Sequence, residues 1–343
     1  MARFLALLAA LLWFSLSRAG GDTVVVALTG DVLMANTFGE YRLPTSGGEL
    51  LFKESAPVLQ RADLALCNLE GPLCDTSLSM HGKDRPHRYA FRCPTDYVGQ
   101  IADAGYDFVS LANNHIHDFG YAGIRQTVSA LDSVQVKYAG VKGYAKYAVV
   151  ARNGVRYGIC AFGFNAYTYK LSDTTLVKKI LDELCRKSDV QIVSLHGGAE
   201  GSEASVLPYG EERYFGERRG NLRFFAHFCI DHGADIVYGH GPHVLRCVEC
   251  YKGRFIAYSL GNFCTPFGVA VTGKCGLSAI ILARVRRNGE FVGGQIYSYK
   301  QRSGVGPRYD YSHAATLLIK ELTESDSAGA TISVSKYGEL RTK

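Results

Sequence analysis

The sequence predicts an α/β protein in which two β-sheets pack face to face between helices. Apolar runs rich in β-branched residues alternate with segments of helical periodicity, which is the pattern of βαβ units and of a parallel or mixed sheet. Two hairpins are also expected, turning at Asn153-Gly154 and Asn288-Gly289, because Asn-Gly favours tight turns. Strands from both halves of the chain therefore indicate a two-sheet sandwich flanked by helices.

Five helices are expected before residue 303, and a sixth near 313–322. Gly105 and Gly233 come just after two of them, where a left-handed cap favours glycine, and each is followed by a strand. No fixed-period repeat is evident, so we expect one domain over 20–303 and a helix with a polar tail over 304–343. The five helices are expected at 52–61, 95–104, 121–132, 174–187 and 221–232.

The amino-acid composition limits which kinds of protein and partner are expected. The chain has 343 residues and 47% hydrophobic content, enough to bury a large core. Its formal net charge is +6, but lysine and arginine are dispersed rather than gathered in a stripe with stacking aromatic residues. A nucleic-acid partner is therefore not expected, whereas an anionic substrate or a cell-wall surface is compatible with this charge.

The N-terminus resembles a secretory signal peptide. Met1-Ala2-Arg3 precedes an apolar run over 4–14, and Ser17-Arg18-Ala19 offers a small residue for cleavage. The run is shorter than the roughly 20 residues that span a bilayer. We expect residues 1–19 to be removed and the mature protein to be exported to the periplasm or the extracellular space. An uncleaved N-terminal anchor is the alternative.

Ten cysteines in an exported chain are first interpreted as disulfide candidates, because oxidising compartments preserve such bonds. Cys247 and Cys250 form a C-x-x-C without a second pair at zinc-finger spacing, so a disulfide or two free thiols is favoured over a structural zinc. The pairs expected to close loops are Cys74 with Cys93 and Cys264 with Cys275.

Acidic, amide and imidazole side chains follow the expected strands. In α/β sheets these strand ends are where sites are built. Taken singly, each residue has a structural reading, such as a helix cap for the aspartate or a turn for the asparagine. Together they form a ligand set for one or two divalent ions of manganese, iron or zinc. The predicted ligands are Asp31, Glu70, Asn114, His196, His240 and His243.

His115 is the predicted catalytic acid. It directly follows Asn114, so it would face the substrate rather than the metal, and histidine titrates near neutral pH. Asp118, three residues further on, could orient its ring. His117, His227 and His232 are assigned to the structure rather than to the site.

A basic cluster surrounds Tyr89-Ala90-Phe91. Arginine binds phosphate or carboxylate with two parallel hydrogen bonds, so Arg85, Arg88 and Arg92 are predicted to bind an anionic substrate. A solvated loop is the alternative. A second charged run over 211–219 carries both signs and is interpreted as exposed surface or an oligomer contact.

Six motifs lie in order between about residue 24 and residue 299. They are Gly30-Asp31-Val32-Leu33, Asn68-Leu69-Glu70-Gly71-Pro72, Ala112-Asn113-Asn114-His115 with Asp118 and Gly120, His196-Gly197-Gly198 with Glu200, Gly239-His240-Gly241-Pro242-His243-Val244, and Tyr258-Ser259-Leu260-Gly261-Asn262-Phe263. Together they resemble the capsule-synthesis protein CapA family, which is similar in fold to the calcineurin-like metallophosphoesterases. The resemblance implies a four-layer α/β/β/α sandwich with metal ligands at the sheet edges. Asn262, in the last motif, is assigned to substrate binding.

The chain departs from the family pattern at four positions. Leu33 stands where metallophosphoesterases usually carry a histidine, which implies a weak or empty first metal subsite. Gly197 replaces a tryptophan and Gly201 an aromatic residue of many CapA-like sequences. Gly241 replaces the first histidine of the His-Pro-His variant. These departures bear on metal number and substrate fit more than on fold.

Three functions are compatible with these residues. The first is a metal-dependent phosphoesterase that acts outside the cytoplasm, with an implied role in the synthesis or export of poly-γ-glutamate capsule or another envelope polymer. The second is a non-catalytic accessory protein that binds the polymer or envelope-associated protein partners on the same scaffold. The third is a metal-dependent amidase acting on an envelope peptide polymer. The expected ligand is accordingly a phosphate ester or poly-γ-glutamate, and fold alone does not decide among the three.

Overall fold

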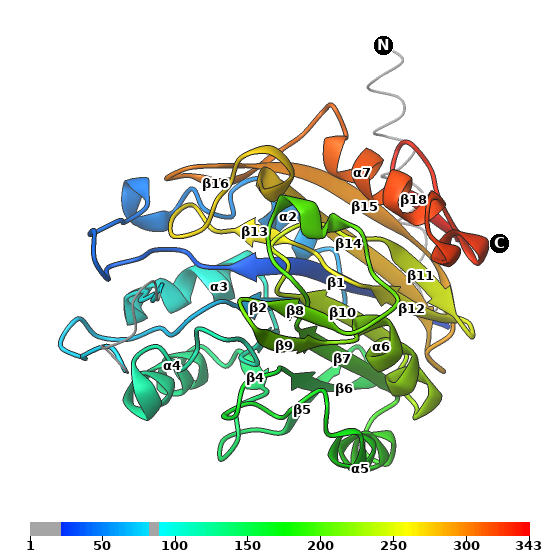
Figure 1. Ribbon diagram of the computed structural model, residues 1–343, viewed down its shortest axis with the longest axis horizontal. Coiled ribbons are helices and arrows are strands. Elements are labelled where there is room, and N and C mark those ends of the chain that lie inside the picture. Colours follow the sequence, from blue (N-terminus) through cyan, green and yellow to red (C-terminus); the bar gives the residue numbers. More distant parts are fainter. Residues whose placement is uncertain (1–21, 82–88) are drawn as a thin grey trace.

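The computed structural model describes residues 22–81 and 89–343, which form two β-sheets packed between helices (Figure 1). The predicted four-layer α/β/β/α sandwich is confirmed. The expected signal peptide, Arg85 and Arg88 lie outside the described residues. The helices are α2 (Ala56–Leu59), α3 (Val98–Ala104), α4 (Gly120–Ser133), α5 (Thr174–Cys185), α6 (Leu222–Asp231) and α7 (Ala314–Glu324).

The larger sheet has the strand order β17-β18-β15-β14-β1-β2-β3-β4, with β13 paired to β1 and β16 to β15. Its half from β1 to β4 is parallel, and the strands from β14 onward are antiparallel. The strands are β1 (Thr23–Val32), β2 (Leu64–Leu69), β3 (Phe108–Ser110), β4 (Lys137–Ala139), β13 (Asn262–Cys264), β14 (Leu277–Arg286), β15 (Phe291–Arg302), β16 (Gly306–Tyr309), β17 (Ile332–Val334) and β18 (Glu339–Thr342).

The smaller sheet has the order β11-β12-β10-β7-β6-β5, with parallel pairing from β12 to β6. β8 (Glu212–Tyr214) and β9 (Glu217–Gly220) form a separate two-stranded hairpin. In the chain, this hairpin follows β7 and precedes α6. The strands of the smaller sheet are β5 (Tyr147–Arg152), β6 (Val155–Phe162), β7 (Val190–His196), β10 (Ile236–His240), β11 (Val248–Tyr251) and β12 (Arg254–Ala257).

Three separate apolar cores account for the four layers. The first lies between the sheets and joins Leu28 and Ile281 of the larger sheet to Ile192 and Ile236 of the smaller one. The second lies between the larger sheet and helices α2, α3 and α4, and the third lies between the smaller sheet and helices α5 and α6. Because side chains alternate between the two faces of a strand, each sheet supplies residues to two cores.

The predicted hairpin turns are confirmed, whereas one predicted helix is wrong. Both predicted hairpins form, and Asn153 and Gly154 have the positive φ angles of a tight turn, +50° and +74°. Gly105 takes the left-handed conformation at the end of α3. The helix expected over 52–61 is reduced to the four residues of α2, because Pro57 suits a helix start and turns occupy the preceding residues.

The C-terminal segment packs onto the sandwich. Strands β17 and β18 extend the larger sheet next to β15, and α7 lies beside them (Figure 1). Asp310 precedes α7 and accepts hydrogen bonds from Ser312 N at 3.1 Å and Ala314 N at 2.8 Å. Burial raises the pKa of this carboxyl, but these bonds and Lys300 outweigh burial and lower the pKa to about 2.

All ten cysteines are free thiols in the structure. Neither expected pair, Cys74 with Cys93 or Cys264 with Cys275, is bonded. Nine of the ten are buried, Cys185 being the exception, so these thiols pack as small apolar side chains. Within residues 22–81 and 89–343, no helix is long and apolar enough to cross a membrane.

Candidate metal centre

The carboxyl ends of parallel strands from both sheets meet at one edge of the sandwich. Asp31 lies at the end of β1 and Glu70 directly follows β2, its neighbour in the larger sheet. His196 and His240 are the last residues of β7 and β10 and lie opposite each other in register. Sequence positions as far apart as 31 and 240 are therefore brought into contact by the strand order within each sheet together with the packing of the two sheets.

Three of these side chains fit a single cation. One donor atom each from Asp31, Glu70 and His196 lies within 4.8 Å of the other two, and all three residues are at most 1% exposed. Several of the nearby polar atoms are buried without a hydrogen-bond partner: Oε1 of Glu70, Nδ1 of His196 and Nε2 of His240. Buried donors and acceptors are normally satisfied, so this group has the composition and the unused lone pairs that a divalent ion requires.

The pKa shifts of these three residues also favour a bound cation. Burial and the charge of Asp31 raise the pKa of Glu70 to about 7. Burial also raises the pKa of Asp31, but hydrogen bonds to His240 and His243 outweigh it and hold that pKa well below its usual value. Burial lowers the pKa of His196, which keeps the ring neutral. A bound cation would stabilise the two carboxylates in their charged form.

Two asparagines orient the carboxylates. The amide nitrogen of Asn68 donates to Oδ1 of Asp31 at 2.9 Å and to Oε2 of Glu70 at 2.5 Å. Asn113 in turn donates to Oδ1 of Asn68 at 3.1 Å and to the backbone oxygen of Leu69 at 2.7 Å. These bonds leave Oε1 of Glu70 free. Sequence reasoning missed both roles, although Asn68 lies two residues before Glu70 and so on the same strand face.

Asn114 reaches the centre through His196. Its Oδ1 lies 2.8 Å from Nε2 of His196, while Nδ1 of that ring lies 3.7 Å from Oε2 of Glu70. When Nε2 donates to Asn114, Nδ1 keeps the lone pair that a cation would use. The backbone oxygen of Asn114 accepts a hydrogen bond from Tyr167 at 2.7 Å, which fixes the loop after β3.

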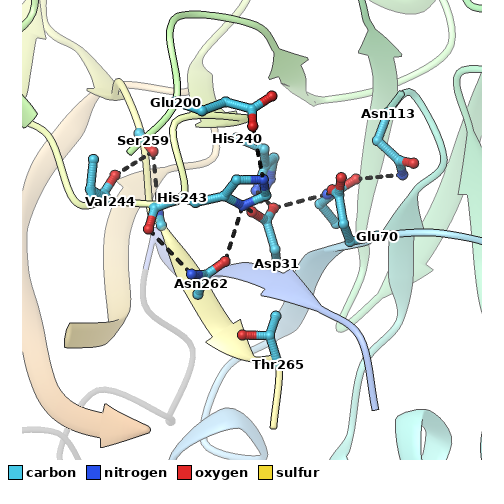
Figure 2. A network of polar contacts seen from close by, with 12 residues as sticks. Asp31, Glu70, Asn113, Glu200, His240, His243, Val244, Ser259, Asn262 and Thr265 are labelled. Atoms are coloured by element: carbon cyan, nitrogen blue, oxygen red, sulfur yellow. Dashed lines mark hydrogen bonds and ion pairs between the residues drawn. The ribbon is translucent and has the colours of Figure 1, made fainter. Parts of the chain in front are cut away.

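The two histidines of the Gly239–Val244 motif flank Asp31 (Figure 2). Nδ1 of His240 lies 3.0 Å from Oδ1 of Asp31, and Nδ1 of His243 lies 3.0 Å from Oδ2. Burial lowers the pKa of His243, but the hydrogen bond and charge of Asp31 outweigh it and raise that pKa to about 9. The six predicted ligands thus lie together, and their binding of an ion stays a prediction.

His115 and Asp118 form the predicted pair. Nδ1 of His115 lies 2.9 Å from Oδ2 of Asp118, which also accepts a hydrogen bond from the backbone of Phe91 at 2.8 Å. The ring of Phe91 packs on His115 with centroids 4.2 Å apart. Burial lowers the pKa of His115, but Asp118 and Glu70 outweigh it and raise that pKa.

Two predicted substrate-binding residues have structural partners instead. The guanidinium of Arg92 is buried and donates to both side-chain and backbone oxygens of Thr37, at 2.9 and 2.7 Å, and it lies 5.2 Å from the ring centroid of Phe119. Asn262 is fully buried, and its amide binds His243 and backbone oxygens. Most donors of both side chains are used by the loops around the centre, so their observed role is to hold those loops.

A further carboxylate reaches the centre from the loop after β7. Oε2 of Glu200 lies 4.0 Å from Nε2 of His243, and Oε1 is bound by Arg219 at 2.7 Å. The guanidinium of Arg219 also lies 4.2 Å from the ring centroid of Phe164. The charged run over 211–219 predicts exposed surface, but the side chain of Arg219 is 5% exposed, because opposite charges adjacent in the chain can pair inward as well as outward.

The hairpin that carries Arg219 is held by a buried ion pair. Arg246 is 1% exposed and donates to both oxygens of Glu212, at 2.9 and 2.7 Å. It also donates to the backbone oxygen of Ala204 at 2.7 Å. This pair connects the β8–β9 hairpin to the loops after β7 and β10, which carry Glu200 and His243.

Comparison with known proteins assigns the family. The sequence model described as "Bacterial capsule synthesis protein PGA_cap" matches residues 25–266. This chain belongs to the PGA_cap family. The match contains all six predicted ligands together with His115, Asp118 and Glu200, so the expected resemblance to CapA is confirmed.

Two Bacillus proteins are similar to this chain over most of its length. The "Capsule biosynthesis protein CapA" of Bacillus anthracis is 26% identical over 279 residues, covering 78% of this chain and 65% of that protein. The "PGA biosynthesis protein CapA" of Bacillus subtilis is 25% identical over 285 residues, covering 78% and 69%. The matches thus span about two thirds of the length of these relatives.

Solved structures are similar to this chain at low sequence identity. A hypothetical protein from Thermus thermophilus has 17% identity and a TM-score of 0.50, covering 80% of this chain and 99% of that one. A 5'-nucleotidase precursor from the same organism has 14% identity and a TM-score of 0.48, covering 88% and 59%.

Proposed function

We propose that this protein is an exported, metal-dependent hydrolase of the phosphoesterase type that serves the synthesis or export of an anionic envelope polymer. The observation that carries the proposal is the buried group of Asp31, Glu70 and His196, whose donor atoms lie within 4.8 Å of one another and include unpartnered lone pairs. Asn114 and His240 lie directly beside this group.

The residues divide the chemistry among them. A divalent ion bound here would supply an activated water and would stabilise the charge that develops on the phosphoryl oxygens. Asn68 holds the two carboxylates in place and thereby presents Oε1 of Glu70. Asp118 binds Nδ1 of His115, so Nε2 remains to give a proton to the leaving oxygen.

Separate observations support the proposed export and the proposed substrate. The first 19 residues have the pattern of a cleavable signal, which supports a location outside the cytoplasm. The names of the Bacillus relatives associate them with capsule and PGA biosynthesis, which supports a polyanionic polymer as the biological context. The ester that is cleaved would then be a phosphate ester of an envelope precursor.

The test combines metal content with hydrolysis. Protein purified without chelators should hold one to two transition-metal ions per chain by inductively coupled plasma mass spectrometry, and less in Asn114→Ala. With manganese, iron or zinc added, His115→Ala should lose most phosphate-ester hydrolysis, while the matched control His232→Ala, outside the site, should keep it. Absence of metal in the wild-type protein after reloading with each ion would refute the proposal.

A non-catalytic accessory role is the second candidate. Its support is the name of two Mycobacterium tuberculosis relatives, each 26% identical over 238 residues: "Probable polyglutamine synthesis accessory protein". Under this function, poly-γ-glutamate binding should persist in His115→Ala, and no phosphate or amide bond should be cleaved by the wild-type protein with any of the three metals.

A further inference from the structure

A cleft lies beside the predicted catalytic histidine. Its volume is about 420 Å³, within the roughly 300–1,000 Å³ of small-molecule sites. The lining includes Asn36, Phe38, Glu40, Arg42, Tyr89 and Phe91. Phe91 connects the cleft to the metal centre, because its ring also packs on the ring of His115 with centroids 4.2 Å apart. A group attached to an oxygen that His115 protonates would therefore begin next to this cleft.

One wall of the cleft, formed by residues 36–42, is a closed turn. Asn36 and Arg42 exchange backbone hydrogen bonds of 2.9 and 2.8 Å. The side-chain oxygen of Asn36 accepts hydrogen bonds from the backbone nitrogens of Phe38 at 3.1 Å and Arg92 at 3.2 Å. The turn is thereby fixed to the segment that carries Phe91, so the cleft is preformed, as most small-molecule sites are.

The loop after β13 completes the lining with a glycine. A Cβ on Gly268 would lie 2.9 Å from a ring carbon of Phe91 and 3.0 Å from Cδ2 of Leu33. The amide of Asn262 holds this loop, because it donates to the backbone oxygen of Ala270 at 3.2 Å. Glycine at 268 therefore lets the loop close against Phe91 without moving that ring away from the centre.

The lining combines aromatic rings with charges that cancel. Tyr89 is 76% exposed and Phe38 is half-buried, so both rings can pack on a ligand. Glu40 and Arg42 form an ion pair and are the charged members of the described lining. A polyanionic chain gains no net attraction from such a cleft. A neutral ring with several hydroxyl groups fits it better, because its C–H face packs on aromatic rings while carboxylate and guanidinium groups bind its hydroxyls.

We propose that this cleft is the leaving-group subsite and takes the ring of a carbohydrate, so that the substrate is a phosphate ester of a sugar. Tyr89 packs on the sugar ring, and Glu40 accepts a hydrogen bond from one of its hydroxyls. The proposal rests on the proposed function for the cleavage step. In that step the bond between phosphorus and the sugar oxygen breaks and a water oxygen bonds to phosphorus. Nε2 of His115 gives its proton to the sugar oxygen, and the proton released by the water replaces it.

Sugar binding tests the cleft without any chemical step. Saturation-transfer NMR is recorded on the full-length protein with excess Zn²⁺, which is diamagnetic, using N-acetylglucosamine as the probe. The wild type should transfer saturation to the ring protons of the sugar. Tyr89→Ala and Glu40→Gln should lose most of that signal, whereas the control Tyr311→Ala, 83% exposed and outside the cleft, should keep it. Absence of transfer, a signal that survives Tyr89→Ala, or stronger transfer to adenosine or to tri-γ-glutamate would overturn the proposal.

Kinetics with two esters test the leaving-group role. Phosphate release is measured from N-acetylglucosamine 1-phosphate and from ethyl phosphate, which share the phosphoryl group and differ in the leaving group. With Mn²⁺ supplied, the wild type should have a kcat/KM about 10-fold or more higher for the sugar ester, because binding of the remote ring lowers the barrier. Tyr89→Ala should lower this ratio about 3- to 10-fold, the effect of one aromatic contact, and Tyr311→Ala should leave the ratio as in the wild type.

The outcomes separate this proposal from the proposed function. Equal kcat/KM for the two esters in the wild type, or an unchanged ratio in Tyr89→Ala, would overturn the leaving-group assignment while leaving a phosphoesterase in place. If neither ester is cleaved with manganese, iron or zinc, the proposed function fails and the leaving-group role fails with it. The NMR experiment would then still decide whether the cleft binds a carbohydrate.

Discussion

Removing Arg246 should destabilise the fold more than most single substitutions. Arg246→Met deletes a guanidinium that is 1% exposed, binds both oxygens of Glu212 and also binds the backbone oxygen of Ala204. The carboxylate of Glu212 would then be buried with the backbone N–H of Ala199 as its remaining partner, at 2.9 Å. An uncompensated charge in such a position costs about 3–5 kcal/mol.

The chain offers a matched control. Arg218 and Glu211 form an ion pair of similar length, 2.8 Å, but their side chains are 71% and 36% exposed. Solvent screens this pair, so Arg218→Met should change the free energy of unfolding by less than about 1 kcal/mol. The double variant Arg246→Met with Glu212→Leu removes both buried charges and should recover more than half of the loss, because the desolvation cost disappears together with the attraction.

Equilibrium unfolding in urea is measured on five proteins: the wild type, Arg246→Met, Glu212→Leu, the double variant and Arg218→Met. The slopes of the transitions are compared to confirm that the unfolded states are alike. A cost below about 1 kcal/mol for Arg246→Met would refute the reasoning, since the charge left behind must then be solvated. A double variant as unstable as the sum of the two single variants would refute it differently, by showing that the two side chains act independently.

Three further perturbations have defined outcomes. Asn68→Ala should weaken Mn²⁺ binding by about 10- to 100-fold in isothermal titration, because both carboxylates lose their orienting donor, while the exposed control Gln60→Ala should not. Gly241→Ala places a Cβ 2.4 Å from a backbone oxygen at a φ of +112°, so urea unfolding should show a larger loss than Gly253→Ala, whose Cβ meets nothing at a φ of +74°. The pKa of Asp310 is lowered in the folded protein, so this carboxylate contributes about 1–2 kcal/mol to the free energy of unfolding above pH ~4, and the contribution is lost as the pH falls toward 2. The free energies of unfolding of Asp310→Asn and the wild type should therefore differ at pH 7 and converge in acid.

The positions of strands and turns could be predicted from the sequence because they depend on local chemistry. Asn153-Gly154 specifies a tight turn by its tolerance of positive φ, and the expected hairpin forms around it. The convergence of Asp31, Glu70 and His196 also follows from pattern alone, since the carboxyl ends of parallel strands share one edge. These inferences required no knowledge of side-chain packing.

The positioning residues could not be predicted in the same way. The direction in which Arg219 pairs depends on the path of the β8–β9 hairpin, which no periodicity in 206–221 reveals. The partner of Glu212 is Arg246, 34 positions away, and nothing local indicates that separation. Similarly, Arg92 belonged to an apparent anion-binding cluster, yet its donors satisfy loop oxygens, because burial rather than residue type decides what an arginine binds.

The departures at Gly197 and Gly241 are one structural change rather than two. A Cβ on Gly241 would meet the backbone oxygen of Gly197 at 2.4 Å, and a Cβ on Gly197 would meet the backbone oxygen of Arg219 at 2.5 Å. Three backbone segments are therefore in close contact: the loop after β10 packs on the loop after β7, and the loop after β7 packs on β9. A tryptophan at 197 could fit only if β9 moved away, and Arg219 would then no longer reach Glu200 as it does here. The small residues at 197 and 241 and the Glu200–Arg219 pair thus depend on each other in this structure, and both lie on the side of the centre that carries Glu200 and His243.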